Sequence, residues 1–336
     1  MHEKMMQRKY GVSVCGTGKY LPQEVITNEQ LEKWTKIKAE TIEEKTGIRS
    51  RRKVGDNETA SEISALASRD ALEMAGIDPE ELGLIITCTF TGDYIYPAVS
   101  CKIQDLLGAK NAGAFDLLAN CTGFQVGLGV ASDRMLVDPS IEYTLVIGTA
   151  VQSRFIDWSD PNSAIFFGDG VGAAVLKQVP PEYGILSNEV FSNGRVFDSV
   201  RLRGGGSSFP MRNDNIDQEL QYYELDGMEV WKQVVQFQPK VINRSLAKID
   251  KTIEDVDFFI FHQANLLLIE YLMGKMKQPM EKTYTNVEDY GNTADASQAI
   301  TLCDAVTKGL LKRGDLIVIS GVGAGFTFGS TVMRWY

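Results

Sequence analysis

The sequence is poor in the residues that mark several common kinds of site. It contains only two histidines and five cysteines, and no two cysteines have the close spacing of a zinc or redox motif. An odd number of unclustered cysteines argues against a disulfide framework, so we expect free thiols and no metal. The five are Cys15, Cys88, Cys101, Cys121 and Cys303.

Long apolar segments and an excess of basic residues are also missing. No run approaches the ~20 apolar residues that span a bilayer, and the opening MHEKMMQRKY lacks the apolar stretch of a secretory signal. The 34 basic and 44 acidic residues give a net charge of -10, which repels nucleic-acid phosphates and anionic membrane surfaces. We therefore expect a cytoplasmic protein with no nucleic-acid or membrane partner.

The chain of 336 residues is longer than one hydrophobic core usually serves, so two subdomains are expected. Short apolar runs alternate with helical patterns, which predicts an α/β layered fold. Strands are expected at Gly11–Cys15, Leu84–Thr89, Ala114–Leu118, Tyr143–Ile147, Gly172–Leu176, Phe258–Phe261, Leu316–Ile319 and Thr331–Trp335. Helices are expected at Ala60–Ala75, Cys101–Leu107, Gly123–Leu136, Met228–Ala247, Gln263–Met276 and Ser297–Leu311.

An internal similarity suggests that the chain consists of two related halves. PEELGLIITCTF and IEDVDFFIFHQA each lead from an acidic turn into a short buried strand. Generic α/β patterning is the alternative explanation, because buried parallel strands resemble one another. The paired prolines in 179–184 mark the expected boundary, giving halves 1–180 and 181–336. A long irregular loop is expected at 193–215.

Cys121 is the cysteine best placed to act as a nucleophile. It lies in LLANCTGFQVG, where a strand pattern stops and a helical pattern begins. Unpaired N–H groups at a helix N-terminus stabilise a thiolate, so we expect a lowered pKa for Cys121. The other four cysteines fall within strand or helix patterns, where cysteine usually serves as a small apolar residue.

His262 and Asn292 are the candidates to assist that thiol. Apart from His2, His262 is the only imidazole, and it follows a strand, where α/β sheets present ligands. Taken alone, His262 is equally well explained as a histidine with a purely structural role, and Asn292 beside a glycine is typical of a turn. Together with a cysteine nucleophile they point to acyl transfer. The glycine-rich 167–175 and 320–330 are expected to form tight turns near the site rather than phosphate loops.

Several motifs together resemble one family. NCTGF at Cys121, HQANL at His262, GNTADAS at Asn292 and the C-terminal GAGFTFGS are similar to β-ketoacyl-acyl carrier protein synthase III, as are TGIRSRR, YPAVSCKIQ and FGDGVGAAVL. The resemblance spans nearly the whole chain. It implies a thiolase fold, with two pseudo-duplicated halves in a five-layered αβαβα arrangement, assembled as a homodimer.

The resemblance also implies roles for single residues. Cys121 would take up the acyl group, and His262 and Asn292 would hold a malonyl thioester and stabilise its enolate, without cofactor or metal. The substrates would be thioesters of coenzyme A (CoA) or of acyl carrier protein. Further roles would be backbone oxyanion donors at Cys121 and Ala324, and acyl-pocket walls at Phe326 and the partner subunit's Tyr96.

Some positions depart from the family pattern. The places where the family usually clamps the CoA adenine fall near Thr41 and Pro161, so we expect that clamp to be missing. Leu267 replaces a basic residue associated with carrier docking, and a different carrier or priming thioester is therefore expected. A basic patch for an acidic carrier could still come from Arg49, Arg52 and Lys275, with Arg51, Lys53 and Lys277. A merely solvated run of charges is the alternative for each of them.

Three functions are therefore weighed. The leading hypothesis is decarboxylative condensation with a malonyl carrier protein, in fatty acid initiation or a specialised pathway. The second is acyl transfer to an alcohol, amine or other acceptor with His262 as base, and Asn292 weakly favours the first because an amide can donate to a carbonyl. The third is a non-catalytic carrier-binding subunit.

Overall fold

Two mixed β-sheets, one from each half of the chain, form the centre of the molecule. The computed structural model describes residues 8–211 and 218–336. The first sheet has the order β1-β7-β6-β4-β5 and is built from β1 (Gly11–Tyr20), β4 (Leu82–Cys88), β5 (Gly113–Leu117), β6 (Tyr143–Ala150) and β7 (Gly170–Val179). The second has the order β11-β12-β13-β8 and is built from β8 (Gly184–Ser192), β11 (Phe258–Phe261), β12 (Leu316–Gly323) and β13 (Thr327–Arg334).

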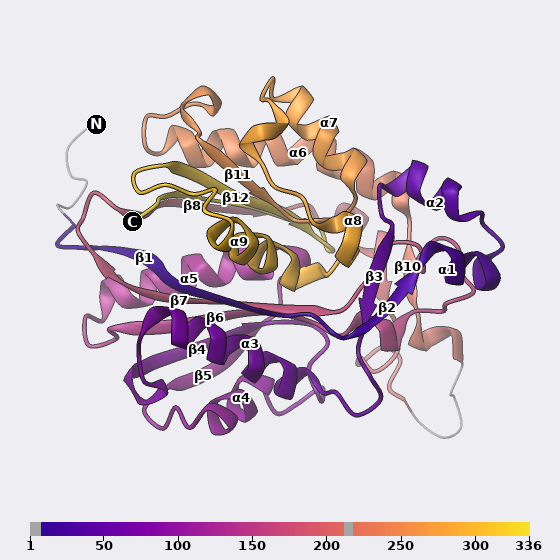
Figure 1. Ribbon diagram of the computed structural model, residues 1–336, viewed down its shortest axis with the longest axis horizontal. Helices are drawn as coiled ribbons and strands as arrows, with labels where there is room; N and C mark the ends of the chain where they lie inside the picture. Colours follow the sequence, from indigo (N-terminus) through magenta and orange to yellow (C-terminus); the bar gives the residue numbers. More distant parts are fainter. Residues whose placement is uncertain (1–7, 212–217) are drawn as a thin grey trace.

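Helices cover both sheets and fill the space between them (Figure 1). The outer face of the first sheet packs on α3 (Ala60–Ala75) and α4 (Val99–Leu107), and that of the second packs on α6 (Gly227–Ala247) and α7 (Leu266–Lys275). Between the sheets lie α5 (Gly123–Val137) and α9 (Ser297–Thr307), whose apolar residues share one core with both inner faces. The expected αβαβα layering is therefore confirmed. Within the described ranges, no helix is long and apolar enough to cross a membrane.

The two sheets repeat one strand pattern. In the first, β4 and β6 are parallel while β7 and β1 follow antiparallel; in the second, β11 and β12 are parallel while β13 and β8 follow antiparallel. At the place of β5, the second sheet has a single parallel bridge between Phe259 and Thr283. The chain passes from the first sheet to the second in the turn after Val179. The two similar sequences that suggested this repeat lead into β4 and β11, as expected.

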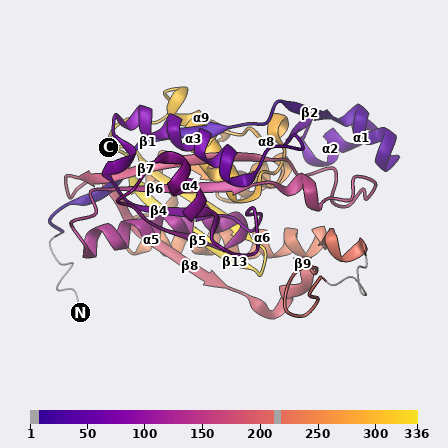
Figure 2. The ribbon, with the colours of Figure 1, turned by 90° about the horizontal axis from the view of Figure 1, so that it is seen from below.

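Smaller elements gather at one end of the layers (Figures 1 and 2). They are β2 (Glu24–Thr27), β3 (Ser50–Lys53), β9 (Val200–Leu202), β10 (Tyr223–Leu225), α1 (Asn28–Thr35), α2 (Ala39–Thr46) and α8 (Val287–Tyr290). The expected irregular loop at 193–215 contains a 3-10 turn and β9 in its described part; its remainder, like His2, lies outside the described residues.

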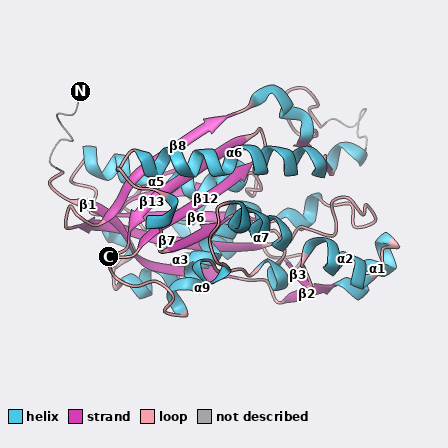
Figure 3. Ribbon diagram, turned by 90° about the horizontal axis from the view of Figure 1, so that it is seen from above, coloured by secondary structure: helices cyan, strands magenta, loops and turns pink. Residues whose placement is uncertain are grey.

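Local sequence signals account for the longer helices. Helix α3 begins at a reciprocal cap in which the Thr59 hydroxyl accepts from the Glu62 N–H, and it ends at Gly76 in the left-handed conformation. Helix α6, the long helix along the outer face in Figure 3, starts with the Asp226 carboxylate accepting from the N–H of Glu229. The predicted helix boundaries at these two elements agree with the structure to within one residue.

Candidate active site

Cys121, His262 and Asn292 line one cavity, although they are far apart in the chain. Cys121 and His262 follow the parallel strands β5 and β11, whose carboxyl ends face this region. Ala324 and Phe326, from the turn between β12 and β13, also line the cavity. The remaining walls are mostly apolar and include side chains of α6 and α7. The structure thus brings together the three residues that the sequence singled out.

The environment of Cys121 differs from the expectation in one respect. Its position is as expected, because it lies in the 3-10 turn η2 (Asn120–Thr122) directly before α5. Burial, and secondarily the negative charge of Asp295, raise the pKa of the Cys121 thiol. The prediction of a lowered pKa is therefore wrong, because desolvation of the thiolate outweighs the stabilisation by nearby N–H groups. The resting residue is a thiol, and its activation requires a base.

His262 is a neutral imidazole with one nitrogen already engaged. Burial lowers the pKa of His262 to about 3. Its backbone N–H donates to the carbonyl of Ser320 on β12 at 3.0 Å, which fixes the residue against the neighbouring strand. Its Nδ1 lies 2.7 Å from the hydroxyl of Ser297, the first residue of α9. Among the described residues Nε2 has no hydrogen-bond partner, so that nitrogen is free for a substrate or for Cys121.

Asn292 lines the cavity with its amide oxygen already engaged. The preceding Gly291 has φ 69°, and a Cβ at that position would lie 2.8 Å from the carbonyl oxygen of Phe166, so only glycine fits. The backbone of Asn292 forms a parallel bridge with Phe167. Its side-chain oxygen accepts from the N–H of Ala294 at 2.9 Å. Because this bond fixes the oxygen, Nδ2 is left as the donor toward the cavity.

The turn between β12 and β13 packs against the cysteine segment. The amide of Asn120 donates to the carbonyl of Ala324 at 3.0 Å. A Cβ on Gly323 would lie 3.2 Å from the nitrogen of Cys121, so the two backbones approach closely. Gly325 has φ 129°, a backbone conformation that residues other than glycine rarely adopt. The expected tight turn beside the cysteine is confirmed.

A buried acid that sequence reasoning missed lies next to the thiol. Asp295 is 1% exposed, and neither of its carboxylate oxygens has a hydrogen-bond partner among the described residues. One of these oxygens would lie 2.5 Å from a Cβ placed on Gly123, the first residue of α5. Burial raises the pKa of Asp295 to about 8. The only sequence signal was an acidic residue within the otherwise small and apolar ADA segment.

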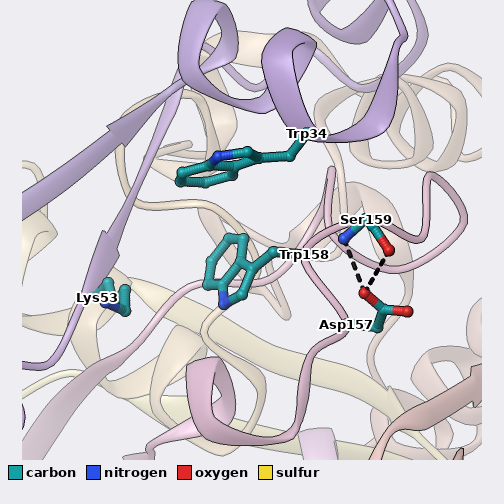
Figure 4. A pocket seen from close by; sticks show the side chains of 5 residues that line it. All are labelled: Trp34, Lys53, Asp157, Trp158 and Ser159. Carbon is teal, nitrogen blue, oxygen red and sulfur yellow. Dashed lines mark hydrogen bonds between the residues drawn. The ribbon is translucent and has the colours of Figure 1, made fainter.

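A second pocket lies away from the thiol, and two tryptophans dominate it (Figure 4). The rings of Trp34 on α1 and Trp158 meet edge to face, with centroids 5.8 Å apart. Lys53 on β3 lines the same pocket, whose volume is about 460 Å³. Trp158 also packs in the apolar cluster that contains Phe167 and Leu225, two residues of the cysteine cavity. The sequence signal for this pocket was missed: two of the four tryptophans, Trp34 and Trp158, lie near Thr41 and Pro161 in the chain.

The predicted docking residues divide into exposed and buried ones. Arg49 is exposed and pairs with Asp289 at 2.8 Å, while Lys275 is exposed and donates to a backbone carbonyl. Arg52 is partly buried and donates to the carbonyl of Pro22. Arg51 is fully buried and bonded inside the protein, so its assignment to a surface patch is wrong.

Tyr96 lies outside the cavity of its own chain. It is 84% exposed, in the segment between β4 and α4. The adjacent Tyr94 and Ile95 are exposed as well, as are Phe115 and Leu118 at the edge strand β5. These exposed apolar residues lie on two stretches of chain, the segment that follows β4 and the edge strand β5 that pairs with β4.

The αβαβα fold and a cavity that joins a cysteine, a histidine and an asparagine define a thiolase-fold condensing enzyme. Sequence comparison specifies the family. Residues 115–194 match the family model of 3-oxoacyl-[acyl-carrier-protein (ACP)] synthase III, and residues 246–335 match the model of its C-terminal part. The chain belongs to the β-ketoacyl-[acyl-carrier-protein] synthase III family.

Individual relatives agree over the full length. The synthase of Caldanaerobacter subterraneus subsp. tengcongensis is 38% identical over 330 residues, which cover 98% of this chain and 99% of that protein. The crystal structure of the Aquifex aeolicus synthase is 35% identical, with a TM-score of 0.88 over 97% of this chain and 100% of that one. The priming β-ketosynthase of the R1128 polyketide pathway is 31% identical, with a TM-score of 0.89 over 100% and 99%. The expected thiolase fold is therefore confirmed.

Proposed function

We propose that this protein is an acyltransferase that condenses an acyl thioester with a malonyl-acyl carrier protein, with loss of carbon dioxide, through an acyl group on Cys121. One observation carries the proposal: Cys121, His262 and Asn292 line one cavity, and the Nδ1 of His262 and the amide oxygen of Asn292 are already hydrogen-bonded. This leaves Nε2 of His262 and the amide N–H₂ of Asn292 to meet a substrate. The product is a 3-oxoacyl thioester, the first extended intermediate of fatty acid synthesis or of a specialised pathway.

The first half-reaction loads the enzyme. Because burial keeps Cys121 protonated, its thiol proton passes to the neutral His262 as the sulfur attacks the acyl carbonyl. The backbone N–H groups of Cys121 and Ala324 hold the oxyanion, an interaction typically worth about a hundredfold or more in rate. The leaving thiol takes the proton back from His262, so the imidazole ends neutral and the acyl group remains on sulfur.

The second half-reaction forms the carbon–carbon bond. The bond between the malonyl carboxylate and its methylene carbon breaks, carbon dioxide leaves, and the electron pair delocalises onto the thioester oxygen. Asn292 and His262 donate hydrogen bonds to this enolate oxygen. These hydrogen bonds are stronger in the enolate than in the bound ester, because the oxygen then carries the negative charge. The carbanion then attacks the acyl carbonyl, the bond between that carbon and the Cys121 sulfur breaks, and the thiolate takes a proton from water.

The tryptophan pocket supports a CoA thioester as the priming donor. A planar base could stack on the indoles of Trp34 and Trp158, with the Lys53 ammonium near its phosphates. Stacking of a base on an aromatic side chain is worth about 1–3 kcal/mol. We expect Trp158→Ala to raise KM for acyl-CoA by about tenfold and to leave acyl-pantetheine, which lacks the nucleotide, unaffected. Trp231→Ala, in a tryptophan that packs on Tyr271 instead, is the matched control.

The exposed apolar residues at β5 and after β4 support a second copy of this chain as partner. The exposed edge strand β5 and the neighbouring segment with Tyr96 present unpaired backbone and apolar side chains together, a combination that isolated proteins usually cover. In a dimer through this edge, the partner subunit's Tyr96 would reach the acyl pocket beside Phe326. Arg49, Arg52 and Lys275 remain the proposed docking residues for the acidic carrier.

One experiment separates condensation from plain acyl transfer. The protein is incubated with malonyl carrier protein and a panel of acyl-CoA donors, while intact mass and release of carbon dioxide are followed. We expect one acyl group on Cys121, followed by carbon dioxide in equal amount. Acylation without carbon dioxide would favour the acyltransferase that uses an alcohol or amine acceptor, and no acylation with any donor would favour the non-catalytic subunit.

A further inference from the structure

The hydroxyl of Ser297 joins His262 to the segment that orients Asn292. Ser297 is fully buried, and its oxygen lies 2.7 Å from Nδ1 of His262 and 2.8 Å from the carbonyl oxygen of Ala294. The N–H of the same Ala294 fixes the amide of Asn292. Ala294 thus positions two side chains: its carbonyl binds Ser297, which contacts His262, and its N–H binds Asn292. Its φ is 38°, a conformation that is uncommon for residues other than glycine.

A serine hydroxyl has one hydrogen, so it can donate to only one of these neighbours. When it donates to the Ala294 carbonyl, it must accept from Nδ1–H of His262, and Nε2 faces the cavity as a bare acceptor. When it donates to Nδ1, the hydrogen of the neutral imidazole is on Nε2. The first arrangement has one more hydrogen bond, which favours it by about two- to tenfold.

We propose that Ser297 is a positioning residue that sets the tautomer of His262, holding it in the Nδ1–H form in the free enzyme and releasing it to the Nε2–H form for condensation. This inference rests on the proposed function. The two half-reactions need opposite properties at Nε2: an acceptor for the Cys121 proton in the first, and a donor to the enolate oxygen in the second.

The second arrangement is also accessible. The backbone N–H of Ser297 donates to the Ala294 carbonyl as well, so that oxygen keeps a partner when the hydroxyl turns away. The change moves one imidazole hydrogen: water in the cavity donates a proton to Nε2, the Nδ1 hydrogen returns to water, and the Ser297 O–H then turns toward Nδ1, so no heavy atom of the protein needs to move. With the pKa of His262 at about 3, the imidazole stays neutral throughout the ordinary pH range, so the position of its single hydrogen decides what it can do.

Nitrogen-15 NMR tests the resting state directly, because the chain has only two histidines. In the His2→Ala variant, His262 is the sole labelled imidazole. We expect couplings that identify a protonated Nδ1 and a bare Nε2 in the free enzyme. A hydrogen on Nε2 in the free enzyme would overturn the proposal, whatever the variants of Ser297 do.

Separate assays of the half-reactions test the consequence. We expect Ser297→Ala to move the hydrogen to Nε2, to slow acylation of Cys121 by about tenfold or more, and to change condensation by the pre-acylated enzyme less than about threefold. Ser297→Thr keeps a hydroxyl and should restore acylation. The matched control is Ser68→Ala, which removes a buried serine that donates to the carbonyl of Ser64 in α3.

The results separate this inference from the proposed function. If the wild-type protein fails to acylate Cys121, the proposed function fails. If the wild-type protein acylates normally and Ser297→Ala slows both half-reactions equally, or neither, the tautomer role of Ser297 is wrong.

Discussion

Replacing Asp295 by Asn should make the protein more stable, and the gain should grow with pH. The carboxyl is buried without a partner, so the folded protein keeps it protonated up to a pKa of about 8, whereas its ordinary value is 3.8. Between these values the folded state binds one proton more than the unfolded state, so stability falls as pH rises. At 1.36 kcal/mol for each pH unit, the loss between pH 5 and pH 8 is on the order of 4 kcal/mol.

Asparagine has nearly the same shape and cannot ionise. Its unpaired amide should behave like the neutral acid, so the two proteins should differ little near pH 4 and increasingly toward pH 8. Urea unfolding at one fixed protein concentration, at pH 5, 6, 7 and 8, measures the difference, with the exposed Asp133→Asn on α5 as control. Parallel pH dependences for Asp295→Asn and the wild type would show that Asp295 is ionised in the folded protein, and would refute the reasoning.

Three further outcomes are expected. Asp295→Asn should also speed alkylation of Cys121 by iodoacetamide several-fold at pH 9 but not at pH 6, because the charge that raises the thiol pKa is removed; equal rates at pH 9 would count against that coupling. Arg51→Ala should lower the free energy of unfolding by about 3 kcal/mol or more, because Arg51 donates to Asn28 and to a buried carbonyl. The exposed Arg49→Ala should lower it by at most about 1 kcal/mol. Equal losses for the two variants in urea unfolding would contradict the burial argument. Leu118→Asp should convert a dimer to monomers in sedimentation velocity, and an unchanged mass would exclude this edge as the interface.

The fold was largely accessible from the sequence because most of its central strands are buried on both faces. Uninterrupted apolar runs such as FFIF at β11 are visible without any tertiary information. Strand β8 was missed, since this edge strand carries Ser, Asn and Glu among its apolar residues. The small helices α1 and α2 were missed because each spans only eight residues, too few for a clear period.

The site was predicted in composition but not in electrostatics. Local sequence indicated the positions of Cys121 and His262 because both follow strands. The pKa of Cys121 depends on burial by other segments and on Asp295, which lies far along the chain. For the same reason Arg51 could not be separated from its exposed neighbour Arg49: a run of basic letters does not show which side chain faces the core.

The central claim is that the Asn292 amide serves the enolate and has no part in loading Cys121. Asn292→Ala tests it in a single protein, by measuring acyl transfer to Cys121 and then carbon dioxide release after malonyl carrier protein is added. The account predicts acylation near the wild-type rate and carbon dioxide release slowed by about a hundredfold or more. Condensation at the wild-type rate in this variant would contradict it.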